Sequence, residues 1–189
     1  MIKVYVKKIC KLTPEEEHRV TSTLSDRARA RLAKKTNEAL RTASLCALSL
    51  LTDEQRSALD YSTQGRPSLT GLKTDISISH SKAYVAVAIS DFFRDYVGID
   101  IEDIEHQTSS TRFLTENEQN ALKNGANYIE IWTKKEALYK FLKSDCAPFV
   151  QLDSTRPDLY GASFTTLTVN SSILTVCTPP DKKIEIIQK

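Results

Sequence analysis

Three short stretches between residues 76 and 101 have the residue pattern of β-strands and follow one another closely. They read ISIS at 76–79, YVAVAIS at 84–90 and YVGIDI at 96–101. The short link at 80–83 predicts a hairpin, and a turn is expected over 91–95. The third stretch is predicted to be a buried strand. A chain with this run of strands must build a sheet, which its other elements have to cover.

Helices and further strands are predicted on both sides of this run. Capping boxes at 13–16 and 115–118 mark two helix starts. The other expected elements are helices from Ser25 to about Leu51 and over 126–143, a loop over 61–72, and strands at 2–6, 164–169, 173–178 and 184–187. This order of elements is typical of an α+β fold.

Composition limits the classes of protein that remain. Of the 189 residues 40% are apolar, which is enough for a core, and the net charge of +2 excludes a polycation. The four cysteines and three histidines are scattered without a CxxC pair, which argues against a structural zinc site. We expect reduced thiols in a cytoplasmic chain, without a secretion signal or membrane span. These residues are Cys10, Cys46, Cys146 and Cys177, and His18, His80 and His106.

Two carboxylates stand two residues apart on the third predicted strand. On a strand Asp100 and Glu102 point to the same face, about 6.6 Å apart, while Ile99 and Ile101 point to the other. Carboxylates held this close repel each other and favour a cation between them, and Mg²⁺ prefers such oxygen ligands. An ordinary solvent-exposed strand edge, continued by further acidic residues, explains the same pattern, so both interpretations stay open.

Other polar residues allow a functional and an ordinary interpretation. Glu136 and Lys140 share one helix face, as an exposed ion pair also would. His80, at the hairpin tip, and Arg66 are suited to binding phosphate, but they also fit a turn and a surface. Glu118 completes a capping box, which alone explains it. The basic residues Arg27, Arg29, Arg31 and Lys34 fit a solvated helix face or an anion site.

Five motifs in this order resemble the Sfp-type 4'-phosphopantetheinyl transferases, of the holo-acyl-carrier-protein synthase superfamily. They are QGRP at 64–67, ISISHS at 76–81, VGIDIE at 97–102, RFLTENE at 112–118 and WTKKEALYK at 132–140. The resemblance implies two similar α/β halves related by pseudo-two-fold symmetry, with the active site in the cleft between them. The expected halves are residues 1–96, with the coenzyme A phosphate contacts, and 97–189, with the metal ligands and the catalytic helix.

The resemblance also implies a reaction and its residues. The 4'-phosphopantetheine arm of coenzyme A would move to a serine of an apo acyl or peptidyl carrier protein, with release of 3',5'-ADP. Magnesium, or manganese in its place, would be held by Asp100, Glu102 and Glu136. Glu118 would be the base for the serine, and Lys140 with Glu136 would act at the pyrophosphate. Coenzyme A would be bound by Arg41, Thr42, Arg66, Ser79, His80 and Lys140.

Two departures from the family pattern concern the choice of carrier. The segment KFLKSDCAP lacks the glycine-rich turn that many relatives have after this helix, and the chain is somewhat shorter than relatives that serve peptide synthetases. The carrier is expected to belong to fatty-acid, polyketide or nonribosomal peptide synthesis. A single chain is expected to form its own cleft as a monomer, without nucleic acid or membrane.

Two alternatives to this activity remain. A magnesium-dependent nuclease or phosphodiesterase also combines carboxylates with a lysine, although Lys140 stands at helical spacing from Glu136 and not on a strand. An inactive homologue would bind coenzyme A or a carrier without turnover. The intact set of acidic residues argues against that loss.

Overall fold

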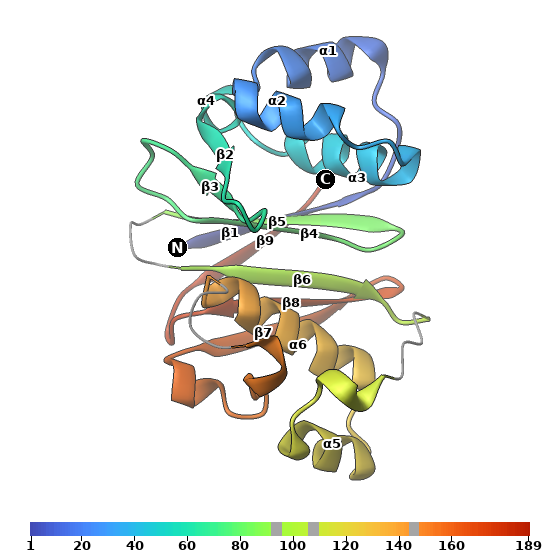
Figure 1. The fold of residues 1–189 in the computed structure, drawn as a ribbon, viewed down its shortest axis with the longest axis vertical. Helices are drawn as coiled ribbons and strands as arrows, with labels where there is room; N and C mark the ends of the chain where they lie inside the picture. Colours follow the sequence, from blue (N-terminus) through green and yellow to red (C-terminus); the bar gives the residue numbers. More distant parts are fainter. Residues whose placement is uncertain (92–95, 106–109, 144–147) are drawn as a thin grey trace.

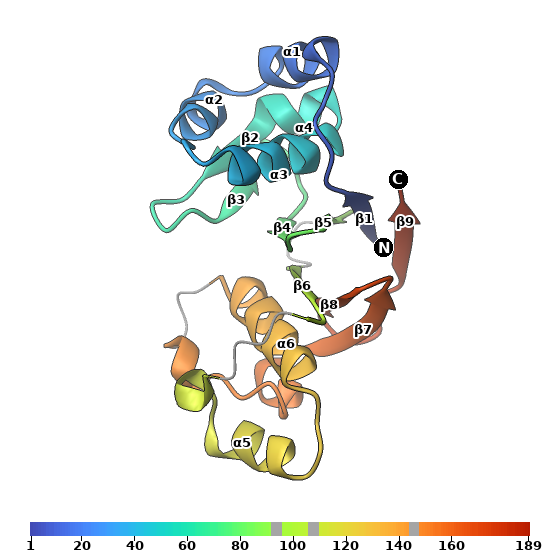
Figure 2. The same cartoon turned by 90° about the vertical axis from the view of Figure 1, so that its right-hand side faces the viewer.

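The computed structural model describes residues 1–91, 96–105, 110–143 and 148–189. Two sheets lie face to face in the middle of the molecule, and the helices cover their outer sides (Figures 1 and 2). The predicted α+β class is therefore confirmed. Most of the turn expected over 91–95, as well as His106 and Cys146, lies outside the described residues.

The first sheet contains both ends of the chain. Its strands are β4 (Ile76–His80), β5 (Tyr84–Ser90), β1 (Ile2–Lys8) and β9 (Ile184–Gln188), in the spatial order β4-β5-β1-β9. The predicted hairpin is present, since β4 and β5 pair antiparallel. β9 pairs with β1 in parallel register. The last strand therefore returns to the sheet of the first half, across the expected division of the chain at residue 96.

The outer face of this sheet is covered by α1 (Pro14–Ser22), α2 (Asp26–Ala33), α3 (Glu38–Ser49) and α4 (Asp53–Ala58) (Figure 1). The prediction of a single helix from Ser25 to about Leu51 is wrong, because α2 ends before Lys34 and α3 begins after Asn37. The Asn37 side chain caps the new helix by accepting a hydrogen bond from the Leu40 amide. The loop expected over 61–72 overlaps a small hairpin of β2 (Leu59–Tyr61) and β3 (Pro67–Leu69).

The second sheet has the order β6-β8-β7, all antiparallel. Its strands are β6 (Gly98–Asp103), β7 (Ser163–Val169) and β8 (Ser172–Thr178), and its helices are α5 (Glu116–Lys123) and α6 (Tyr128–Phe141). Short 3₁₀ turns, η1 (Thr111–Phe113), η2 (Phe149–Gln151) and η3 (Pro157–Tyr160), connect them. The capping box predicted at Thr115 and Glu118 is present at the start of α5.

The core between the sheets fixes the direction of the site residues. Ile99 and Ile101 of β6 pack there against Ile2 and Val4 of β1. On the other side of β6, α6 comes so close that a Cβ on Gly98 would lie 1.9 Å from the Ala137 carbonyl oxygen. Only glycine allows this approach, which brings Asp100 of β6 next to Lys140 at the end of α6.

Candidate functional site

Asp100 lies at the centre of a polar cluster built from three separate motifs. Its Oδ1 accepts hydrogen bonds from Ser79 Oγ on β4 and from Lys140 Nζ on α6, both at 2.7 Å. Lys140 Nζ also donates to Ser79 Oγ at 3.1 Å and to the Ile99 carbonyl at 3.0 Å. Asp100 is only 3% exposed, so these contacts are shielded from solvent. Three residues expected at the site, far apart in the sequence, are thus in direct contact.

Serine side chains join the two sheets at this point. β4 and β6 are edge strands of their sheets. Ser77 Oγ on β4 accepts a hydrogen bond from the Ile99 amide at 3.1 Å, and Ser79 Oγ donates to Asp100. The strand ISIS therefore turns alternate residues toward β6, which orients the carboxylate of Asp100.

The acidic groups beside Asp100 have raised pKa values. Burial, with the neighbouring charge of Asp100, raises the pKa of Glu102 to about 7. Burial also raises the pKa of Glu136, against the opposing effect of Lys140. Asp100 Oδ2 is buried without a hydrogen-bond partner. These observations fit a cation beside the three carboxylates, since it would lower the repulsion and engage Oδ2.

Within the described ranges, no three acidic, histidine or cysteine side chains stand close enough together to form a metal-binding group. The Lys140 ammonium instead supplies the positive charge next to Asp100. The metal ligands Asp100, Glu102 and Glu136 therefore stay a prediction.

A cavity of about 790 Å³ opens beside the acidic residues. Glu102, His80 and Thr42 line it, from β6, the hairpin tip and α3. A smaller cavity of about 180 Å³ adjoins, because His80 lines both. Burial, together with the charges of Lys35 and Lys140, holds the pKa of His80 below its usual value, although Asp100 and a hydrogen bond with Ser81 oppose this shift. The imidazole is therefore a neutral donor or acceptor near pH 7.

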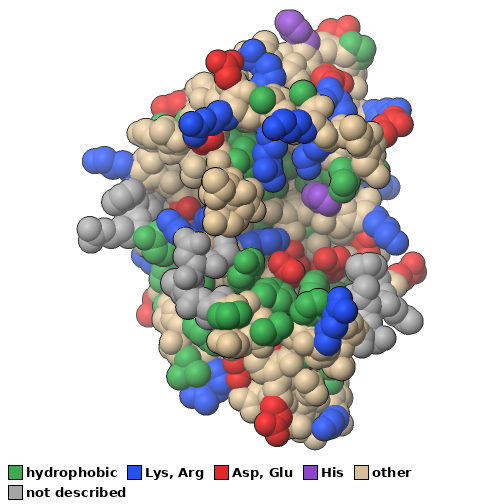
Figure 3. All heavy atoms as spheres, viewed as in Figure 1, with side chains coloured by type: hydrophobic (Ala, Val, Ile, Leu, Met, Phe, Trp, Pro, Cys, Tyr) green, Lys and Arg blue, Asp and Glu red, His purple; other side chains and the backbone are tan. Residues whose placement is uncertain are grey.

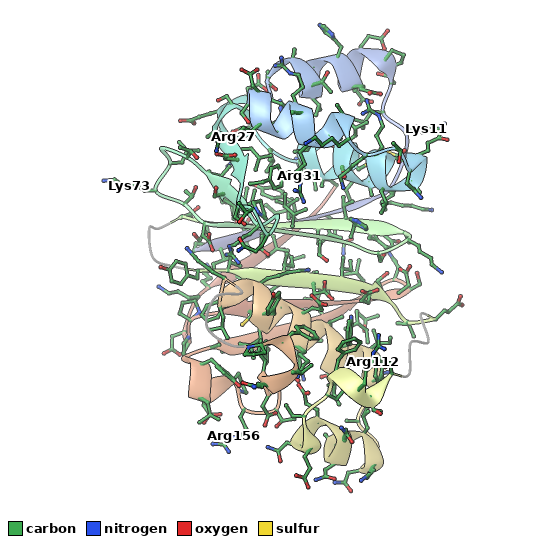
Figure 4. All side chains as sticks on the ribbon, in the orientation of Figure 1. Lys11, Arg27, Arg31, Lys73, Arg112 and Arg156 are labelled. Atoms are coloured by element: carbon green, nitrogen blue, oxygen red, sulfur yellow. The ribbon has the colours of Figure 1, made fainter. Side chains whose placement is uncertain are left out.

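The smaller cavity has a basic wall. Arg31 on α2 and Lys35 line it together with Tyr61 and Gly65, and no acidic residue is among its described lining residues. The Arg31 guanidinium lies over the Tyr61 ring, 4.6 Å from its centroid. Burial and the neighbouring Arg31 charge lower the pKa of Lys35. Figure 4 shows that Arg31 lies below α2, toward the middle of the molecule, whereas Arg27 lies farther out.

Other basic residues of the expected anion site have partners elsewhere. Arg41 pairs with Glu17 at 2.6 Å. Arg27 pairs with Asp60 at 2.9 Å, and Arg29 donates to the carbonyl of Leu24. Arg31, by contrast, lines the smaller cavity. This arrangement distinguishes residues that the sequence alone left equivalent.

Arg66 connects the segment before β4 with the end of α6. Its guanidinium donates a hydrogen bond to the Lys140 carbonyl at the end of α6. It donates another to Asp75 Oδ2 at 3.0 Å. Asp75 Oδ2 also accepts the Val97 amide at 3.0 Å. Arg66 and Asp75 have side chains 16% and 13% exposed. The expected role of Arg66 at a coenzyme A phosphate stays a prediction, and these contacts add a second role for it.

Arg66→Met is therefore expected to destabilise the chain by about 1.5–3 kcal/mol, because charged hydrogen bonds to Asp75 and the helix end are lost. Thermal or urea unfolding measures this change. Lys73→Met is the matched control, since Lys73 lies at the outer edge of the molecule (Figure 4) and is exposed. Equal stability of the two variants would contradict the connecting role of Arg66.

Glu118 is enclosed and lines neither of the two cavities beside Asp100. Its Oε2 accepts the Thr115 amide at 2.8 Å and Lys135 Nζ at 2.7 Å, and its Oε1 accepts the Ser154 amide at 2.9 Å. Both side chains of the Glu118–Lys135 pair are 0% exposed. This geometry favours the capping role over the role of base. Lys135, which also donates to the Leu152 carbonyl, was missed from the sequence because neighbouring lysines usually mark a solvent-exposed helix face.

An aromatic cluster packs around Trp132 of α6. The ring centroid of Trp132 lies 5.6–6.3 Å from those of Phe113, Tyr128 and Phe149. The rings are partly exposed. Figure 3 shows hydrophobic side chains gathered below the acidic ones on this face of the molecule.

Comparison with known proteins gives one finding. Residues 96–182 match the model of the 4'-phosphopantetheinyl transferase superfamily, and the match supports phosphopantetheine transfer in general. It spans β6 through β8, with Asp100, Glu102, Glu136 and Lys140, and includes none of the four strands of the first sheet. No curated protein matches the chain significantly. In the described part of the chain, no helix is long and apolar enough to cross a membrane.

Proposed function

We propose that this chain transfers the 4'-phosphopantetheine arm of coenzyme A to a serine of an apo carrier protein, with magnesium, as Sfp-type transferases do. The observation that carries the proposal is the contact of Ser79, Asp100 and Lys140 beside the 790 Å³ cavity. Three motifs that resemble this family meet there. A random set of surface residues would not gather in one buried cluster.

The donor is a molecule with several phosphates, and basic groups surround part of the cavity system. The 3'-phosphoadenosine end would bind at the smaller cavity, where Arg31 and Lys35 offer positive charge and Tyr61 an aromatic ring. His80 stands between this cavity and the larger one. In this arrangement the pyrophosphate would extend from His80 toward Glu102 and Lys140.

The chemistry requires charge stabilisation at the pyrophosphate. Charge that grows on its oxygens as the bond breaks would be neutralised by magnesium held by Asp100, Glu102 and Glu136. Lys140 would interact with the same oxygens or donate a proton to the departing 3',5'-ADP. Glu118 takes no part in this proposal, because both its oxygens are bonded in the interior.

The acceptor is expected to approach along the aromatic cluster of α6. Trp132 lies four residues before Glu136 and therefore on the same side of the helix. Val150, next to Phe149, is 45% exposed and extends the apolar surface. An apolar face next to the acidic site suits a helical carrier whose serine must reach the pyrophosphate.

Release of 3',5'-ADP from coenzyme A tests this function. We expect release only when apo carrier and magnesium are both present, and kcat/KM across a panel of carriers should identify the pathway. Release without carrier would indicate a phosphodiesterase. Magnesium-dependent cleavage of DNA or RNA, with no release, would support the nuclease instead.

The raised pKa of Glu102 predicts a dependence of stability on pH. The folded chain holds this proton with a pKa of about 7, against 4.5 for an ordinary glutamate. The corresponding stability is present in full below the unfolded pKa and is lost as pH rises through about 7. Without divalent ions, Glu102→Gln should match the parent at about pH 4 and exceed its Tm at about pH 8.

Magnesium should reverse that difference, because the parent binds it through an ionised Glu102 and the variant does not. Differential scanning fluorimetry at both pH values, with and without magnesium, measures the effect. An equal response of both proteins to magnesium would contradict the assignment of Glu102 as a ligand.

A further inference from the structure

Two thiols far apart in the sequence meet beside the larger cavity. Cys10 lies between β1 and α1, and Cys46 lies on α3. The Cys46 sulfur accepts a hydrogen bond from the Cys10 amide at 3.3 Å and donates one to the Cys10 carbonyl at 2.8 Å. Cys10 is exposed, whereas Cys46 is buried. This pairing joins the segment after β1 to the middle of α3.

The Cys46 thiol lies against the backbone of Cys10 in a shielded position. Burial raises the pKa of the Cys46 thiol, although its hydrogen bond with the Cys10 backbone acts in the opposite direction. A sulfur that touches the backbone of another cysteine on both its amide and its carbonyl is within reach of that cysteine's side chain after rotation about χ1. The arrangement has an exposed thiol that meets oxidants and a shielded thiol next to it.

We propose that Cys10 and Cys46 form a reversible disulfide that narrows the coenzyme A cavity, an inference whose second half rests on the proposed function. The oxidant is a hydroperoxide such as hydrogen peroxide. The Cys10 thiol loses its proton and its sulfur attacks one peroxide oxygen, the O–O bond breaks to give a sulfenic acid, and the hydroxide that leaves takes up the proton to form water. The Cys46 thiol then attacks that sulfur and gives up its proton, so that the S–O bond breaks and the hydroxyl leaves with this proton as a second water. The two thiols give up two electrons and the peroxide accepts them.

Residues next to both cysteines line the larger cavity, so the disulfide would change the space available to coenzyme A. Ile9 and Lys11, on either side of Cys10, line the larger cavity, as do Thr42 and Ala43 on α3. Lys11, which is labelled in Figure 4, also forms an ion pair with Glu38 at the start of α3. A disulfide holds its sulfurs about 2.05 Å apart, closer than two unbonded sulfurs, so it draws the segment toward α3. The oxidised form is therefore expected to bind coenzyme A more weakly.

The segment around Cys10 also contacts the hairpin of β4 and β5. The Ile9 amide donates to the Ala83 carbonyl at 2.8 Å, in the link between β4 and β5. In the same link, the Lys82 amide donates to Asp103 Oδ2 at 3.0 Å. A displacement of the segment thus reaches the hairpin tip beside His80 and the end of β6.

Peptide mapping of the full chain tests the first half of the proposal. The folded protein is treated with hydrogen peroxide, free thiols are alkylated, and the digest is compared with a sample reduced by dithiothreitol. We expect one linked pair of peptides, containing Cys10 and Cys46, that disappears on reduction. Cys10→Ser should abolish the link, and its exposed position leaves the fold intact. Cys146→Ser, which removes a different thiol, should keep it. A link between another pair, or oxidation of single thiols without a link, would overturn the proposal.

Calorimetric titration with coenzyme A tests the second half without turnover. The oxidised parent should show a several-fold higher Kd than the reduced parent, and Cys10→Ser should show the reduced value under both conditions. An unchanged Kd in a fully linked sample would overturn the effect on the cavity. A reduced chain that binds no coenzyme A would overturn both that effect and the proposed function, while the linked peptides still decide the disulfide.

Discussion

Asp100→Asn is expected to lower kcat for phosphopantetheine transfer by at least about 10²–10³-fold, because a site that stabilises developing charge loses its central anion. The amide keeps the size of the side chain but no longer attracts Lys140, which contacts Asp100 Oδ1 at 2.7 Å. It also removes the buried oxygen without a partner, Oδ2, from the proposed metal site. Steady-state rates at increasing magnesium concentration measure the loss.

Glu105→Gln is the matched control for this variant. Glu105 belongs to the same acidic run after VGID but is exposed, so its loss should leave the rate unchanged. The melting temperature of Asp100→Asn should be recorded as well, to separate a lost charge from a lost fold. If Asp100→Asn keeps most of its rate and its response to magnesium, the metal assignment is wrong.

Lys135→Met is expected to destabilise the chain by about 3–5 kcal/mol, or roughly 10 °C in Tm, because it leaves the Glu118 charge buried without its partner. Both side chains of the pair are 0% exposed. The pair connects the start of α5, the middle of α6 and the backbone at Leu152 and Ser154. Chemical unfolding of parent and variant measures the difference.

The neighbouring lysine supplies the control. Lys134 pairs with Glu130 at 2.5 Å, but those side chains are 28% and 41% exposed, so Lys134→Met should cost less than about 1 kcal/mol. Adding Glu118→Gln to Lys135→Met should recover part of the stability, since no uncompensated charge then remains. Similar losses for Lys134→Met and Lys135→Met would contradict the account of the buried pair.

Much of the fold could be predicted because its signals are local. Alternation of apolar residues predicted β4, β5 and β6, and the capping box of Thr115 and Glu118 predicted the start of α5. The break between α2 and α3 was missed, although Asn37 is a typical N-cap residue, because the apolar residues on both sides of it suit a helix. In the structure the Leu40 amide donates a hydrogen bond to Asn37 Oδ1, which identifies the new start.

The candidate site could be predicted in part, for the same reason. Asp100 and Glu102 stand two residues apart, and polar and apolar residues alternate along β6. This pattern indicated a polar face opposite Ile99 and Ile101, which do lie in the core between the sheets. The sequence paired Lys140 with Glu136, whereas the Lys140 ammonium contacts Asp100 and Ser79. Contacts between distant segments depend on packing and leave no local pattern.

The partners of Arg66 and Lys135 show most clearly that contacts between distant segments cannot be predicted from a local pattern. Arg66 contacts the Lys140 carbonyl 74 residues away, and Lys135 contacts Glu118 17 residues away. No periodicity marks either pair, so a residue with a clear motif position can acquire a structural role that the motif does not reveal. Glu118 illustrates this most clearly, because its capping role and its buried partner together account for both of its oxygens.

The intact mass of an apo carrier protein, incubated with the folded chain, coenzyme A and magnesium, tests the central proposal most directly. We predict a gain equal to one phosphopantetheine arm, and no gain when a chelator removes magnesium or when the acceptor serine is replaced by alanine. A carrier mass that stays unchanged across several apo carriers, with a preparation shown to be folded, would contradict the proposed transferase function.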